Sequence, residues 1–124
     1  MPVNDDPLLP PEWLTDHLDD DDLVLIQIEG DRVPYDEAHL PGAVYAHGYD
    51  DFTAERGRVR ALVPLPDELA ATLGRLGVDQ SNRIVCYAAG KSMWPSRAYW
   101  VLRYYGFPRV HLADRSLAAL QRGQ

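Results

Sequence analysis

The stretch RIVCYAAGKSMWPSRAYWVLRYYG, residues 83–106, decides the fold that the sequence predicts. Residues 83–87 form a short apolar run, which is typical of a strand covered on both faces of a parallel sheet. Small and polar residues follow at 88–93 and indicate a loop, and helical periodicity over 94–105 predicts a helix. The apolar stripe of this helix consists of Ala98, Val101, Leu102 and Tyr105. The stretch therefore predicts a strand, a loop and a helix in succession.

The same alternation continues on both sides of this unit. Further strands are expected at residues 23–28, 43–46 and 110–112, and further helices at residues 12–18 and 66–76, with a last helix beginning at 117–120. Residues 30–42 are polar, and residues 47–64 have no clean period, so we expect a long surface connection over 47–64. Strands that alternate with helices predict an α/β fold with a mostly parallel sheet flanked by helices.

Length and composition set the class of protein. A chain of 124 residues is expected to form one domain over 1–124, with residues 1–9 as an irregular tail. Hydrophobic residues make up 46% of the chain, which excludes disorder of the low-hydrophobicity kind, and no apolar run is long enough to span a membrane. The first residues lack the basic start and apolar run of a signal peptide, so we expect a cytoplasmic protein.

Charge and ligand-type residues argue against several partners. The net charge of −7 should repel nucleic acid and anionic lipid. The four aspartates at 19–22 lack the glycine and spaced glutamate of a calcium loop, so they are expected to form a solvated turn. One cysteine cannot form an internal disulfide, and the four histidines show no ligand-like spacing. We therefore expect no metal and no cofactor.

The candidate site is the loop after Tyr87, because ligands of parallel α/β sheets bind beyond the carboxyl ends of the strands. Motifs around this loop and along nearly the whole chain fit one family pattern, and they are Glu12-Trp13-Leu14, His17-Leu18, Tyr35, Ala38 to Ala43, Leu65-Pro66, Leu73, Leu76-Gly77-Val78, Val85, Tyr87, Ser96-Arg97-Ala98, Trp100, Leu102-Arg103 and Gly106. Together these segments resemble the rhodanese domain, specifically the N-terminal domain of thiosulfate or 3-mercaptopyruvate sulfurtransferases. It implies the rhodanese-like three-layer α/β sandwich.

The resemblance also implies a chemistry. In active rhodaneses a cysteine thiolate at the start of this loop takes the outer sulfur of a donor such as thiosulfate and passes it, as a persulfide, to an acceptor such as cyanide. In this chain that position is Ala88, which cannot carry sulfur. Cys86 is the alternative nucleophile, but it lies about 6–7 Å further into the strand. A buried, unpaired cysteine ordinarily behaves as a small hydrophobic residue.

Other loop residues leave a second question open. Gly90, Lys91, Ser92 and Arg97 could hold a small anion through backbone amides and positive charge. The alternative is a solvated Lys91 and an Arg97 paired with an acidic side chain. The chain also departs from the family at the end of its first long strand, where Gln27 and Glu29 replace an aspartate and an arginine, and near its end, at residues 114–116 and at Leu120.

Two functions follow from these features. The first is a non-catalytic rhodanese-family module with a degenerate active site, either structural or partner-binding, which would pair with a catalytic rhodanese domain or with itself. The second is a working thiosulfate or 3-mercaptopyruvate sulfurtransferase that forms its persulfide on Cys86. Whether the isolated chain is an enzyme therefore depends on that thiol.

Overall fold

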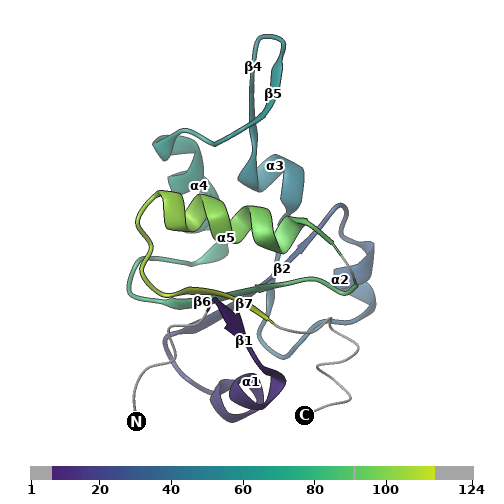
Figure 1. The fold of residues 1–124 in the computed structure, drawn as a ribbon. Helices are drawn as coiled ribbons and strands as arrows, with labels where there is room; N and C mark the ends of the chain where they lie inside the picture. Colours follow the sequence, from purple (N-terminus) through teal and green to yellow (C-terminus); the bar gives the residue numbers. More distant parts are fainter. Residues whose placement is uncertain (1–6, 91, 114–124) are drawn as a thin grey trace.

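The computed structural model describes residues 7–90 and 92–113, and it has a central parallel sheet with helices on both faces (Figure 1). The strand order is β1-β7-β6-β2-β3, and every neighbouring pair is parallel. These strands are β1 (Leu8–Leu9), β2 (Leu23–Glu29), β3 (Val44–His47), β6 (Arg83–Tyr87) and β7 (Val110–Ala113). A separate antiparallel pair is formed by β4 (Ala54–Arg56) and β5 (Val59–Leu62).

The helices are α1 (Pro11–His17), α2 (Val33–Glu37), α3 (Gly48–Phe52), α4 (Pro66–Leu76) and α5 (Trp94–Tyr104). Alternating side chains of the central strands divide the core into two clusters. On β6, Ile84 and Cys86 pack with residues of α3, α4 and α5, whereas Val85 and Tyr87 pack with Leu14 of α1 and with Leu40. The sheet is therefore covered on both faces, as the apolar runs predicted.

The predicted elements that carry a clear period are confirmed. Strand β6 and helix α4 have the expected bounds, and the other predicted elements among the described residues differ by one residue at one or both ends. Helix α4 begins with a proline in its first turn and ends at Gly77, whose φ of 77° lies in the left-handed region that glycine favours. The expected helix at 117–120 lies outside the described residues.

Three segments differ from expectation. Residues 47–64 are not a plain connection, because they fold into α3 and the β4–β5 hairpin. Residues 30–42 contain the short helix α2, and Leu8–Leu9, expected in an irregular tail, form β1 beside β7. Each of these elements is too short for its apolar residues to show a period. Local contacts stabilise them instead: at the start of α3, for example, the His47 side chain accepts a hydrogen bond from the Asp50 amide.

Candidate functional site

Strands β2, β3 and β6 run parallel and end at the same edge of the sheet, where the loop from Ala88 to Met93 leads into α5. Within this edge, Gln27 of β2 lies opposite Tyr87 of β6, and Glu29 lies opposite His47 of β3. The rule that ligands of parallel α/β sheets bind beyond the carboxyl ends of the strands predicted a site at this edge. The side chains around it decide what the site can do.

Cys86, the alternative nucleophile, lies inside the sheet rather than at its edge. It is paired with Ile26 on one side and Leu112 on the other, and its exposed fraction is 0%. Burial raises the pKa of its thiol from 9.0 to about 12, so almost none of it is thiolate at neutral pH. The thiol is neither accessible nor activated in this conformation.

Ala88 follows the last residue of β6 and is itself 4% exposed. The next amide, that of Ala89, donates a hydrogen bond of 2.7 Å to Oε2 of Glu29. The same oxygen accepts Nε2 of Gln27 at 2.8 Å, while Oε1 of Gln27 is buried without a partner among the described residues. The backbone amide at the start of the loop is thus already hydrogen-bonded to a carboxylate of the chain.

The loop residues expected to hold an anion have the following exposures and contacts. Gly90 and Ser92 are exposed, and the Ser92 hydroxyl accepts the amide of Trp94 at 3.2 Å. Lys91 lies outside the described residues. Arg97 donates from Nε to the carbonyl of Phe52 and from Nη2 to the carbonyl of Ala61, at 3.0 and 2.9 Å. It therefore braces the segment after α3, instead of pairing with an acidic side chain.

Trp94, the first residue of α5, closes part of the same edge. Its ring lies so near Gly48 that a Cβ there would come within 2.1 Å of the ring atom Cδ2. It also meets Tyr49 edge-to-face, with ring centroids 6.3 Å apart. No sequence pattern predicts this contact, because a glycine and a tryptophan 46 positions apart follow no period.

Three other features bear on ligands and partners: possible metal sites, possible membrane spans and the run of aspartates at 19–22. Within residues 7–90 and 92–113, no three His, Cys, Asp or Glu side chains gather as a possible metal site. No helix in that same part of the chain is long and apolar enough to cross a membrane. Of the four aspartates at 19–22, Asp22 is not simply solvated, because Arg109 pairs with it at 2.5 Å and its hydrogen bond lowers the pKa of Asp22.

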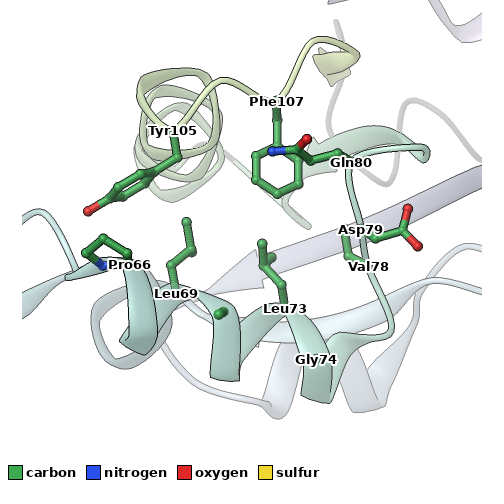
Figure 2. Close-up of a pocket in the computed structure, with 10 residues that line it drawn as sticks. Pro66, Leu69, Leu73, Gly74, Val78, Asp79, Gln80, Tyr105 and Phe107 are labelled. Atoms are coloured by element: carbon green, nitrogen blue, oxygen red, sulfur yellow. The ribbon is translucent and has the colours of Figure 1, made fainter.

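A pocket of about 420 Å³ lies near the far end of α5 from this loop, between α4 and the residues that follow α5 (Figure 2). Leu69, Leu73 and Phe107 make its walls apolar. The Tyr105 hydroxyl already donates to the carbonyl of Pro64, and the Asp79 carboxylate already accepts from Ser81. None of the site residues expected from the sequence lines this pocket.

Comparison with known proteins decides the family. The model of the rhodanese-like domain matches residues 10–122. The chain belongs to the rhodanese-like family. The solved structure of the 3-mercaptopyruvate sulfurtransferase SseA from Escherichia coli superposes on 94% of this rhodanese-like chain with a TM-score of 0.79 and 25% identity, over 48% of its own length. The structure of YnjE shares the fold with the same TM-score at 20% identity.

Curated relatives carry sulfurtransferase names. The chain is 30% identical over 122 residues to the 3-mercaptopyruvate sulfurtransferase of Escherichia coli K12, and 36% identical over 124 residues to the probable 3-mercaptopyruvate sulfurtransferase of Pseudomonas aeruginosa. Each match covers 90% of this chain but only 42% or 43% of the relative. This rhodanese-like domain thus spans less than half the length of these relatives.

Proposed function

We propose that this rhodanese-like chain is a non-catalytic module that binds a protein partner and does not itself transfer sulfur. The observation that carries the proposal is the alanine at position 88, where the family places its nucleophile, together with a sole cysteine that is fully buried. A persulfide needs a thiolate that a donor can reach, and burial works against both requirements for Cys86.

The carboxylate of Glu29 supports the same proposal. Sulfur donors such as thiosulfate are anions, and a rhodanese loop stabilises negative charge with its backbone amides. Here the Ala89 amide is hydrogen-bonded to Glu29, which is 6% exposed and brings a negative charge of its own. An incoming anion would therefore find the Ala89 amide already engaged, and it would lie near the Glu29 carboxylate. Both features make the loop poorly suited to binding an anionic sulfur donor.

The partner-binding half of the proposal rests on the outer face of α5. Met93, which directly precedes the helix, is 68% exposed, and Trp100 and Tyr104 of the helix are 49% and 62% exposed. Their spacing of seven and four residues places them on one stripe. The rings of Trp100 and Tyr104 stack with centroids 5.4 Å apart. Exposed aromatic side chains of this kind are enriched at interface hot spots. This chain covers only 42% of the Escherichia coli relative. Since the sulfurtransferases that the chain resembles pair this domain with a second rhodanese domain, we expect such a domain to be the partner on this stripe.

A sulfur-transfer assay tests the first half. Release of thiocyanate from cyanide is measured with thiosulfate and with 3-mercaptopyruvate as donors, for the natural chain and for Cys86→Ser, with the Escherichia coli relative as positive control. We expect no release above background from either form of the chain. Turnover that disappears in Cys86→Ser would overturn the proposal in favour of the second candidate, a sulfurtransferase that uses Cys86.

Restoring the thiol at the family's position sharpens this assay. We expect Ala88→Cys to turn over little, because Glu29 holds the Ala89 amide and Pro95 leaves the first turn of α5 without one donor. Turnover comparable to that of the Escherichia coli relative would show that only the cysteine is missing.

Sedimentation tests the second half. Without its partner, the apolar stripe should make the isolated chain self-associate at high concentration. Trp100→Ser with Tyr104→Ser should reduce the association, whereas Val33→Ser, which removes an equally exposed apolar side chain from α2, should not. A chain that stays monomeric at all concentrations would contradict a docking role for the stripe.

A further inference from the structure

The β4–β5 hairpin carries three arginines within residues 56–60, in a chain that is acidic overall. It projects from the body of the molecule beyond α3, and residues 55–61 are all exposed (Figure 1). Residues 55–60 read ERGRVR, with a net charge of +2, in a chain whose net charge is −7. Arg56 pairs with Glu68 of α4 at 2.7 Å. No carboxylate of the described residues lies within ion-pair distance of Arg58 or Arg60.

Contacts from the body of the domain hold this hairpin in place. Arg97 of α5 donates to the carbonyl of Ala61 at the base of the hairpin, and the Tyr49 hydroxyl donates to Glu55 at 2.5 Å. Ala61 has a φ of 60°, a conformation that costs free energy in a residue other than glycine and persists where its surroundings enforce it. The two unpaired arginines are therefore presented on a braced support rather than on a loose loop.

We propose that the hairpin is a docking arm for an acidic segment of a protein partner, with Arg58 and Arg60 contacting its carboxylates. The positive charge of the hairpin is complementary to an acidic segment. Among the described strands β4 and β5 pair only with each other, so an extended segment could also add along the free edge of either strand. The inference rests on the proposed partner-binding function, and it adds the chemistry of the partner.

The number and setting of the arginines favour protein over nucleic acid. A protein that binds duplex DNA tightly makes about six to ten phosphate contacts, whereas this arm offers two unpaired guanidinium groups. The chain as a whole has a net charge of −7, which disfavours binding of a polyphosphate much longer than the hairpin. A short acidic protein segment needs only the arm itself.

Fluorescence anisotropy with a labelled glutamate-rich peptide tests the inference at low ionic strength. We expect the natural chain to bind this peptide and not the same peptide with glutamines, and we expect added salt to weaken binding. The double substitution Arg58→Ser with Arg60→Ser should raise the dissociation constant about tenfold, because it removes two exposed ion pairs whose free energies add. Arg103→Ser, which removes an exposed arginine near the other end of α5, should leave binding unchanged.

Several results would overturn the inference. These are no binding of the glutamate-rich peptide, equal binding by the double variant, or tighter binding of a single-stranded oligonucleotide of the same net charge. Circular dichroism of the double variant confirms that the fold is retained, since both side chains are exposed. The sedimentation assay tests partner binding through the stripe on α5 and is independent of this one, so failure of the docking arm and failure of the proposed partner-binding function remain distinguishable.

Discussion

Cys86 lies inside β6, and Ala88 lies just beyond its end, two residues further along the chain. The two positions differ in their place relative to the loop that leads into α5, and that difference decides what a thiol at each could do. Residue 86 lies inside the sheet, is 0% exposed and has a thiol whose pKa burial raises to about 12. Residue 88 lies where the strand gives way to the loop that leads into α5, but it carries no sulfur. Reactivity depends on where a thiol sits relative to loop amides and solvent, not on its presence in the right strand.

The two regions also differ in what holds them together. The interior of β6 is fixed by apolar packing from both faces of the sheet. The carboxyl edge depends on a few specific contacts, chiefly Trp94 against Gly48 and Glu29 against the Ala89 amide. Substitutions at the edge should therefore have large and local effects, and the predictions below begin there.

The largest expected effect comes from Gly48→Ala. A Cβ at this position would lie 2.1 Å from a ring atom of Trp94, so the indole or α3 must move. We expect the free energy of unfolding to fall by about 3 kcal/mol, at the upper end of overpacking costs. Urea unfolding followed by tryptophan fluorescence measures the loss.

Gly74→Ala is the matched control for this change. A Cβ at Gly74 meets nothing within 4 Å, and the residue lies inside α4. Because alanine favours a helix over glycine, this variant should gain about 0.5–1 kcal/mol. Equal effects of the two glycine substitutions would contradict the packing of Trp94 on Gly48.

Glu29→Ala should be the next most costly substitution. It leaves the Ala89 amide and the Gln27 side chain without their shared acceptor, and we expect a loss of about 2 kcal/mol in unfolding free energy. Glu29→Gln keeps an oxygen acceptor and should lose less. Glu37→Ala, which removes an exposed carboxylate from α2, should change stability by less than about 0.5 kcal/mol.

Cys86→Ala should cost about 1–2 kcal/mol at neutral pH, as small core truncations do. The cost should depend on pH, because the folded thiol keeps its proton up to about pH 12 whereas the unfolded thiol loses it near pH 9. The stability that the thiol contributes is complete below pH 9 and falls by about 1.4 kcal/mol per pH unit above it.

The difference between the natural chain and Cys86→Ala should therefore shrink as the pH rises from 8 to 10. Burial also raises the pKa of Tyr87, but this residue is common to both proteins and cancels in the comparison. A difference that stays constant over this range would contradict the burial of the thiol.

The sequence predicted the regions that packing determines. Apolar runs predicted β2 and β6, because both faces of these strands are buried. Leucines at helical spacing predicted α4, because one face of this helix is buried. The hairpin at 54–62 escaped prediction because its charged residues carry no hydrophobic period. The contact of Glu29 with Ala89 joins residues 60 positions apart, and no local pattern reports such a pair.

Labelling of Cys86 with DTNB at pH 8 tests the inaccessibility of the only thiol most directly. A pKa near 12 leaves about one thiol in ten thousand ionised at this pH, and burial adds a requirement for opening of the sheet. We predict that labelling of the native chain is slower by orders of magnitude than labelling in denaturant. Native labelling as fast as that of the denatured chain would contradict a buried, unactivated Cys86.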